Sequence, residues 1–178
     1  SYLVSEIAAR LSVGCNAHAH ARLVDASYGM DAGNKIQTAK AQALAKADLA
    51  GMLSKLYTYG NAAPKGAIIY ANNNVIWNYI AMLEDGNGRS YFVDEKSADP
   101  TVEGHIFGKL VKRDDSIADG VIIAGYPDLF KGNVFDGPDV MPYVAQDGTQ
   151  DRCFDGYELL DCGLAVPKAF AQLTIKTA

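Results

Sequence analysis

Apolar residues recur at every fourth position along the first part of the chain, which predicts a long helix over Leu3–Val24. The recurring residues are Leu3, Ile7, Leu11, Cys15, Ala19 and Leu23. A step of four residues overshoots one helical turn by about 40°, so the apolar stripe winds around the helix. We therefore expect this helix to lie across a domain and to contact different neighbours at its two ends.

A second helix is predicted from Asp48, which has the side chain of an N-cap residue, to Tyr57. Its apolar residues have the three-and-four spacing of one buried face: Leu49, Met52, Leu53 and Leu56. The preceding segment, Lys35–Lys46, is rich in alanine and also fits a helix. The turn residues Gly29 and Gly33 separate that segment from the first helix.

The middle of the chain contains a strand, a helix and a tight turn in succession. Gly66–Tyr70 is a short run with β-branched residues and suits a buried strand. Asn73 or Asn74 can cap the next helix, because an amide oxygen accepts hydrogen bonds from free backbone N–H groups. That helix, Val75–Leu83, is apolar on nearly every face, so we expect it to be buried. Asp85–Gly88 then reverses the chain, since glycine and asparagine tolerate positive φ.

From Gly104 onward, short extended runs alternate with Gly, Asp and Pro, which is typical of strands. The expected strands are Phe107–Val111, Val121–Ala124, Val134–Phe135, Val140–Val144, Tyr157–Leu160 and Phe170–Ile175. Two helices followed by a strand-rich second half predict an α+β fold. The sequence has no internal repeat that would indicate a solenoid.

Composition narrows the class of protein. The 178 residues are 49% hydrophobic and 21% charged, which favours a packed core in one domain or two small lobes. The net charge of −5 argues against a broad basic face for nucleic acid. No apolar run is long enough for a transmembrane helix, and no basic-then-apolar signal peptide opens the sequence. The odd number of cysteines, three, fits reduced thiols in a cytosolic protein.

The histidines and the glycine-rich turn do not have the pattern of a binding site. His18 and His20 project about 200° apart on a helix, so they cannot bind one ion together. His105 has no Cys or acidic residue at ligand spacing. Gly86-Asn87-Gly88 follows a helix and lacks the Lys-Ser/Thr pair of a phosphate loop. We expect no metal and no cofactor.

The segment Asp147–Glu158 has a partial calcium-loop pattern. Residues that can bind calcium stand at the first, third, fifth, ninth and twelfth positions of such a loop. They are Asp147, Thr149, Asp151, Asp155 and Glu158. The sixth position requires glycine for a sharp turn and here is Arg152, and no helix pair flanks the segment. A loop starting at Asp114 or Asp115 lacks its third or fifth ligand. A small calcium-binding or hydrolytic enzyme therefore remains only an alternative.

The sequence also lacks the motifs of hydrolytic enzymes. The sequence has no Gly-x-Ser-x-Gly nucleophile elbow, and Cys15 falls in the apolar stripe of a helix rather than in a reactive site. The ten tyrosines lack interleaved Arg and Lys, so they indicate core and interface rather than a stacking surface for single strands. We expect no catalytic residues and no enzymatic activity.

The order of motifs in the middle of the chain resembles a known family. A strand, an Asn-rich cap, a helix with Trp77 and the pattern Leu83-x-Asp85-x-x-Gly88-Arg89 follow one another. This order resembles the axial domain of tailed-bacteriophage major capsid proteins, which share the Hong Kong 97-like fold.

The resemblance extends over essentially the whole chain. Leu3–Val24 has the place of the family's long spine helix. Ile106–Val111 has the place of its aromatic-Gly-x-Pro-Val segment, but Lys109 and Leu110 stand there and the proline is missing. Val121–Tyr126 resembles the family's Gly-Asp-Phe strand and is followed by Asp128-Leu129-Phe130. Val166–Phe170 resembles the family's closing Arg-x-Pro-x-Ala-Phe segment, but this chain lacks the arginine. Each motif is short, but their shared order and spacing make the likeness specific.

The resemblance implies a phage major-capsid fold, with a long spine helix and an axial domain of mixed sheet flanked by helices. It implies a peripheral domain from residues 1–42 and 161–178 and an axial domain from 43–160. The implied function is structural: a subunit of an icosahedral bacteriophage or prophage head that self-assembles into the shell around the genome. Encapsulin nanocompartment shells share this fold and are the nearest alternative.

The resemblance also implies partners and a location. Copies of the chain would form pentamers and hexamers, with a scaffold, a maturation protease and a portal as further partners. The shell would enclose DNA without sequence-specific binding, assemble in the host cytoplasm and end in the virion, with no membrane contact. Mild acidity permits such a container.

The family's N-terminal arm and extended hairpin loop, which precede the spine helix, have no counterpart here. The chain opens at Ser1 inside an apparent helix, which suggests a trimmed product. Some relatives crosslink a lysine on that loop to a late asparagine, but the corresponding region here holds Gln150 and Asp151, so crosslinking is not implied. We expect these 178 residues alone to give monomers or small oligomers rather than closed shells, which light scattering over a tenfold concentration range would measure.

Overall fold

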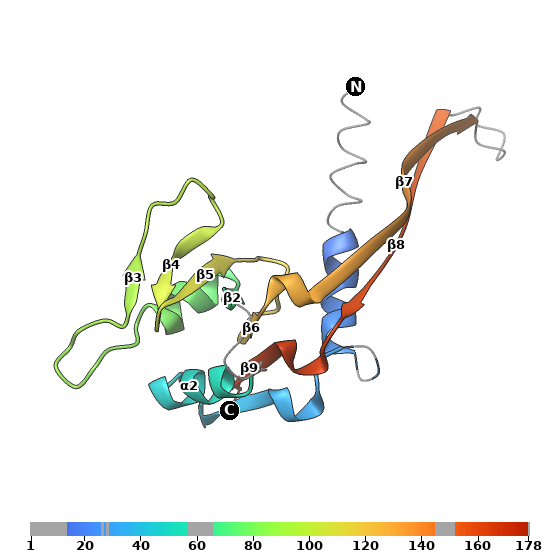
Figure 1. Cartoon of the computed structure of the whole chain (residues 1–178). Helices are drawn as coiled ribbons and strands as arrows, with labels where there is room; N and C mark the ends of the chain where they lie inside the picture. The colour runs from blue at the N-terminus through green and yellow to red at the C-terminus, as the bar shows by residue number, and fades with distance from the viewer. Residues whose placement is uncertain (1–13, 26, 28, 57–65, 145–151, 178) are drawn as a thin grey trace.

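A seven-stranded mixed sheet runs through the centre of the molecule, and a long two-stranded ribbon projects from it (Figure 1). This computed structural model describes residues 14–25, 27, 29–56, 66–144 and 152–177. The sheet strands are β1 (Lys35–Ala41), β2 (Ile68–Ala71), β3 (Phe92–Asp94), β4 (Val102–Ile106), β5 (Lys109–Arg113), β6 (Val121–Gly125) and β9 (Phe170–Lys176). Their order across the sheet is β1-β9-β6-β2-β5-β4-β3. The architecture is α+β, as predicted.

Two strand pairs are parallel and the other four are antiparallel. β1 runs parallel to β9, and β2 runs parallel to β5. β2 lies in the middle of the sheet, where Ile69 pairs with Val111 on one side and with Ala124 on the other. The apolar runs that predicted β2, β6 and β9 therefore form adjacent strands at the centre of the fold.

One face of the sheet, which we call the α2 face, is covered by short helices. They are α2 (Lys46–Ser54), α3 (Asn73–Val75) and the π-helical turn η3 (Ile76–Ile80). Their side chains pack on alternate residues of the strands, and the fully buried members include Leu49, Met52, Ile76, Ile80, Ile69, Val111 and Leu173. Alternation along each strand sends every second side chain into this core.

The opposite face, which we call the N-helix face, is covered at one end by the helix of residues 14–24. Its smaller core contains Leu23, Met30, Ile117, Ile123, Ala169 and Phe170. Gly29 closes the end of the helix, where the Met30 N–H donates to the Leu23 carbonyl over 2.8 Å. The Lys35 ammonium lies 2.5 Å from the Val24 carbonyl, which is favourable at a helix C-terminus.

The helix predicted over Val75–Leu83 is shorter and less buried than expected. Asn72, not Asn73 or Asn74, is the cap, because its side chain accepts a hydrogen bond of 2.8 Å from the Val75 N–H. Helical structure ends at Ile80, and Trp77 and Met82 are exposed. The prediction of full burial was wrong because only one side of this segment faces the sheet.

Two further predictions near α2 are corrected. α2 begins at Lys46, and Asp48 lies inside it, where its carboxylate accepts hydrogen bonds of 3.0 Å from the N–H groups of Ala45 and Ala39. Lys35–Ala41 is strand β1, so the helix expected for this segment was wrong. The exposed edge of β9 supplies backbone partners that outweigh the helix preference of alanine.

The remaining strand predictions differ mainly in their limits. The expected strand Phe107–Val111 is interrupted, because Phe107 and Gly108 have φ of 50° and 69° and form the turn between β4 and β5. The runs expected at 134–135 and 140–144 join into β7 (Phe130–Val144), and 157–160 extends into β8 (Arg152–Leu164). These two strands pair antiparallel as the ribbon.

The division into a peripheral and an axial domain stays a prediction. β1 and β9, from the segments assigned to the peripheral domain, lie in the same sheet as β2 to β6. β7 and most of β8, from the segment assigned to the axial domain, leave that sheet in the ribbon (Figure 1). In the part of the chain that the structure describes, no helix is both long and apolar enough to cross a membrane.

Candidate functional site

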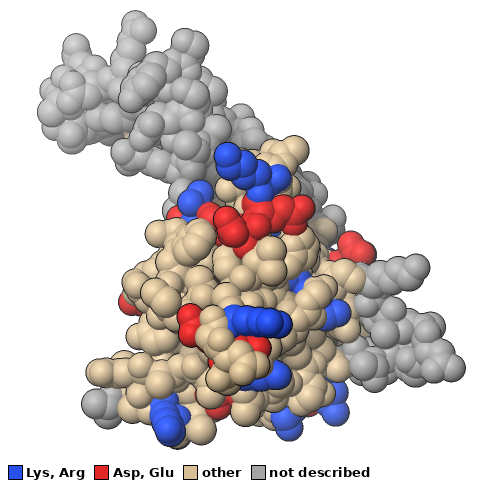
Figure 2. All heavy atoms as spheres, turned by 90° about the vertical axis from the view of Figure 1, so that its left-hand side faces the viewer, with Lys and Arg blue, Asp and Glu red and all other residues tan. Residues whose placement is uncertain are grey.

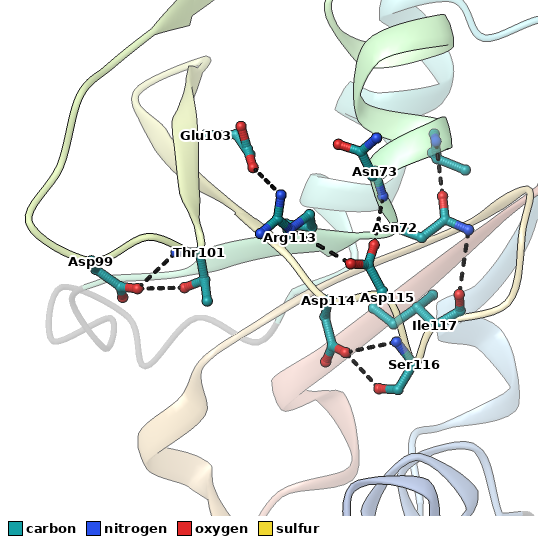
Figure 3. Close-up of polar contacts among 11 residues, drawn as sticks. Asn72, Asn73, Asp99, Thr101, Glu103, Arg113, Asp114, Asp115, Ser116 and Ile117 are labelled. Atoms are coloured by element: carbon teal, nitrogen blue, oxygen red, sulfur yellow. Dashed lines mark hydrogen bonds and ion pairs between the residues drawn. The ribbon is translucent and has the colours of Figure 1, made fainter. Parts of the chain in front are cut away.

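A polar cluster lies at one end of the sheet, where the turn before α3 meets the loop between β5 and β6 (Figure 3). The Asp115 carboxylate accepts a hydrogen bond of 3.1 Å from the Asn73 N–H. Asp119 accepts hydrogen bonds of 2.8 and 2.9 Å from the Asn74 amide, and this amide lowers the pKa of Asp119. The asparagines that suggested a helix cap thus also fasten two loops together.

Asp114 connects this cluster to the helix of residues 14–24. Its Oδ2 atom lies 3.1 Å from Nε2 of His20, and its Oδ1 atom accepts a hydrogen bond of 2.5 Å from the Ser116 hydroxyl. Partial burial opposes ionisation of Asp114, but the hydrogen bonds from Ser116 and His20 outweigh it and lower the pKa. No pattern in the sequence indicated this contact, because His20 and Asp114 are 94 residues apart.

The Ser116, His20 and Asp114 side chains do not have the geometry of a catalytic triad. Ser116 Oγ and Asp114 Oδ2 both approach Nε2 of His20, at 3.2 and 3.1 Å. A triad requires the base to use one ring nitrogen for the serine and the other for the carboxylate. The Ser116 hydroxyl also donates to Asp114 rather than to the imidazole. The arrangement fixes the helix to the loop and does not activate a nucleophile.

Ion pairs continue along the exposed side of β4 and β5 (Figure 3). Arg113 lies 3.3 Å from Glu103 and 3.6 Å from Asp115. Lys112 lies 2.6 Å from Asp99, and hydrogen bonds from Lys112 and Thr101 hold the pKa of Asp99 well below its usual range. Exposed pairs of this kind contribute little to stability, because solvent screens them.

The three histidines lie in different places. Nε2 of His18 is 3.9 Å from Asp161 on β8, and His20 contacts Asp114. Nδ1 of His105 lies 2.6 Å from Glu95, a partner missed in the sequence because antiparallel pairing of β3 and β4 brings the two together. Among the described residues, no group of three or more His, Cys, Asp or Glu side chains is placed to hold a metal ion.

The other candidate binding or reactive residues from the sequence have structural roles or lie outside the residues that the structure describes. Asp85–Gly88 is a turn, in which the Asp85 carboxylate accepts hydrogen bonds from the N–H groups of Asn87 and Arg89 at 2.8 and 2.9 Å. Cys15 and Cys162 are half-buried, and burial raises the pKa of the Cys162 thiol. The calcium-type segment Asp147–Glu158 falls on residues 147–151, outside the description, and on 152–158, of which only the backbone is described.

Large apolar side chains are exposed at several positions of the described residues, among them Val24 on the helix of residues 14–24. Trp77, Met82 and Val93 are 42%, 69% and 63% exposed, and the Trp77 ring packs edge-to-face on Phe92 at 5.8 Å. Met141 and Val144, at the far end of β7, are more than half exposed. Exposed apolar groups of this size are typical of surfaces that contact another protein.

Strand edges are the second surface feature. β7 and β8 pair only with each other, so each presents a row of backbone groups along its outer edge. β1 and β3 form the two edges of the central sheet. β3 has only three residues, and β1 includes Lys35 and Lys40, features that protect a sheet edge from uncontrolled pairing.

Charge is mixed rather than concentrated on the face shown in Figure 2. Basic and acidic side chains alternate there with wide uncharged areas. This face offers no continuous basic stripe of the kind that follows a nucleic acid backbone. The charge distribution on this face therefore gives no indication of strong attraction to DNA.

Comparison with known proteins gives matches in structure. No family model and no curated protein matches the sequence. The capsid of an empty GTA particle matches with a TM-score of 0.69 and 15% identity, covering 99% of this chain and 66% of that chain. A structure from Mycobacterium phage Che8 matches with a TM-score of 0.64 and 16% identity, covering 96% of this chain and 61% of that chain.

A shell of another type matches as well. The holo-SrpI encapsulin complex from Synechococcus elongatus PCC 7942 matches with a TM-score of 0.63 and 14% identity, covering 94% of this chain and 64% of that chain. The chain thus spans slightly less than two thirds of the length of these proteins. The resemblance found in the sequence is confirmed at the level of the fold: the chain has the Hong Kong 97-like fold of phage capsid proteins.

Proposed function

We propose that this chain is a structural subunit of an icosahedral bacteriophage or prophage head, which self-assembles into the shell that encloses the genome. The observation that carries the proposal is the fold match over 99% of the chain to a capsid protein. Matches to Gordonia phage Cozz and Mycobacterium phage Che8, with TM-scores of 0.65 and 0.64, favour the phage class. The matches to a GTA capsid and to an encapsulin complex, both shell proteins, support a structural role.

The ribbon supports self-association. A two-stranded ribbon is marginally stable alone in water and is expected to gain from neighbours that cover its faces. β7 and β8, of 15 and 13 residues, extend beyond the body of the subunit (Figure 1). Met141 and Val144 are exposed on it. A second copy of the chain, packed along the ribbon, would cover these apolar groups.

The proposal includes the arrangement and the location of the subunits. Copies would meet as pentamers and hexamers, because such rings close when two different, complementary edges of neighbouring copies meet head to tail. A scaffold, a maturation protease and a portal would take part in assembly inside the bacterial host, and the finished shell would belong to the virion. The net charge of −5 suits a container that encloses DNA without binding a sequence.

An encapsulin-type nanocompartment is the second candidate. The match to the encapsulin complex, with a TM-score of 0.63 over 94% of the chain, favours this candidate. The two candidates differ in contents, since a phage head encloses nucleic acid and a nanocompartment encloses cargo protein. The contents of purified particles therefore separate them.

The test is purification of particles from cells that produce the complete gene product. Electron microscopy should show closed shells, and nuclease treatment followed by extraction should recover protected DNA. Shells that hold a cargo protein and no DNA would favour the encapsulin candidate. A gene product that forms no particles, alone or with its neighbouring genes, would contradict the proposal.

A matched pair of variants tests the ribbon. Met141→Asp places a charge in the exposed apolar end of β7, and we expect it to reduce particle yield by about tenfold or more, since a loss of about 1.4 kcal/mol per contact has this effect. Asn87→Asp adds the same charge to an exposed turn remote from the ribbon in sequence and should assemble normally. Equal yields from both variants would exclude the ribbon as a contact.

A further inference from the structure

A cavity of about 170 Å³, partly open to solvent, lies between the helix of residues 14–24 and the N-helix face of the sheet. Ala19 and Leu23 line it from the helix, and Ile123 and Phe170 line it from β6 and β9. Phe130, at the start of β7, forms another part of the wall and packs edge-to-face on Phe170 at 6.3 Å. The wall is therefore mainly apolar and partly aromatic.

The size of the cavity corresponds to one aromatic ring. An apolar cavity of about 150 Å³ in another protein stays dry and binds benzene. Water gains few hydrogen bonds against a wall of Leu23, Ile123 and Phe170, so an apolar molecule that fills the space removes poorly held solvent. Ring edges of Phe130 and Phe170 favour an aromatic guest over an aliphatic one.

Three polar side chains on the wall restrict the guest further: Tyr70, His20 and Asp114. Burial, together with the nearby Asp114 carboxylate, raises the pKa of Tyr70, so its hydroxyl keeps its proton at neutral pH. Asp114 is already bound by Ser116 and His20, and it presents negative charge to the cavity. A hydroxyl on the guest finds a partner here, whereas a carboxylate is repelled.

We propose that this cavity is a binding site for a neutral single-ring aromatic molecule that carries a hydroxyl group, with Tyr70 as the polar contact. The ring would lie against Leu23, Ile123 and Phe170, and so would join the helix to the sheet. The assignment does not depend on the proposed shell function, because the whole site lies within one chain. Binding to the folded state alone would raise its thermal stability.

Phenol is the probe for binding, and benzoate is its charged counterpart. Ligand-observed NMR titration of the protein should give a dissociation constant for phenol on the order of 1 mM, as expected for a ligand of so few atoms. Benzoate should bind at least about tenfold more weakly, because the Asp114 carboxylate repels it. Equal binding of phenol and benzoate, or no binding of phenol at about ten times that concentration, would overturn the proposal.

Two substitutions on one helix supply a matched test of location. Ala19→Leu fills the cavity and should abolish phenol binding, whereas Ala21→Leu, on the exposed side of the same helix, should leave it unchanged. Both substitutions change helix propensity equally. If Ala19→Leu binds phenol like the unmodified protein, the molecule binds elsewhere and the assignment is wrong.

Tyr70→Phe tests the polar contact. It removes one oxygen and keeps the ring, so we expect phenol to bind about threefold to tenfold more weakly while benzene binds unchanged, in line with the loss of one hydrogen bond. A parallel loss of phenol and benzene binding would show that Tyr70 only supports the wall. In that case the cavity would take apolar rings without selecting a hydroxyl, which contradicts the proposed ligand class.

Discussion

The two faces of the central sheet are held to their helices by different means. On the α2 face, Leu49 and Met52 from α2 and Ile76 and Ile80 from η3 are completely buried against the strands. On the N-helix face, Leu23 is buried beside a cavity, and polar contacts such as His20 with Asp114 supplement a smaller apolar core. One face is therefore close-packed, and the other combines packing with directed polar contacts.

The difference has an energetic consequence. A close-packed residue loses all of its contacts when it is truncated, because its neighbours cannot close the space. A residue that already borders a cavity has fewer contacts to lose. The α2 face should therefore supply more of the stability, and the N-helix face should tolerate change and respond more strongly to pH and to small molecules.

The largest expected effect comes from truncating one leucine on each face. Leu49→Ala should lower the free energy of unfolding by about 3–5 kcal/mol, because Leu49 is fully buried. Leu23→Ala, the matched substitution beside the cavity, should cost about 2–3 kcal/mol. Urea unfolding of both variants measures the difference. A larger loss for Leu23→Ala would reverse the ranking of the two faces.

Gly29→Ala should have the next largest effect, and it acts on the N-helix face. A Cβ atom at Gly29 would lie 2.4 Å from the Leu23 carbonyl oxygen, 2.6 Å from that of Asp25 and 2.7 Å from that of Arg22. Because backbone atoms cannot yield as a side chain does, the end of the helix must shift, at a cost of about 1–3 kcal/mol. Thermal unfolding checks this, with Gly86→Ala, where the Cβ atom meets nothing within 4 Å, as the control.

Gly51→Ala should stabilise the protein by about 1 kcal/mol, since alanine restricts the unfolded chain and favours the helix. Gly51 lies inside α2, and a Cβ atom there meets no neighbour within 4 Å. The substitution therefore strengthens the helix of the α2 face without altering the core. A lower midpoint of urea unfolding would show that this side of α2 is already in contact with another part of the protein.

The smallest expected effect is on pH dependence. The pKa of Asp114 is lowered in the folded state, so its contribution is present above the unfolded pKa of about 3.9 and is lost as pH falls through the lower, folded value. Asp114→Asn should therefore reduce the loss of stability on acidification below about pH 4. The effect should stay within about 1 kcal/mol, because the side chain is partly exposed.

The control for that experiment is Asp128→Asn, which removes one exposed carboxylate from η4 (Pro127–Leu129). Unfolding by urea at several pH values compares the two variants with the unmodified protein. If both variants have the same pH dependence, the contact between His20 and Asp114 contributes nothing to the N-helix face.

Local apolar patterns were sufficient to predict several elements. The three-and-four spacing of four residues predicted a buried face on α2: Leu49, Met52, Leu53 and Leu56. Leu53 is only partly buried, and the other three are buried. The runs at 68–71, 121–125 and 170–176 form strands, because β-branched residues suit a pleated, buried surface. The order of short motifs was also enough to indicate the Hong Kong 97-like fold, since that order reflects the sequence of elements.

Features that depend on distant partners required the tertiary structure. The alanine-rich segment Lys35–Ala41 became a strand only because β9 presents an open edge beside it. The helix after Asn72 is half-exposed because only one of its sides meets the sheet, which its uniformly apolar sequence does not reveal. β7 and β8 pair from end to end with two register shifts, although glycines interrupt both strands and prolines interrupt β7, since a free edge does not need every N–H group.

The candidate sites show the same division. The sequence by itself determined which side chains can carry charge, accept hydrogen bonds or fill a core, and it correctly separated His18 from His20. It did not determine that His20 meets Asp114, that Glu95 meets His105, or that a ring-sized space remains beneath Ala19. Those contacts join residues far apart in the chain or on separate strands. They exist only after the sheet has fixed the positions of the loops and of the helix of residues 14–24.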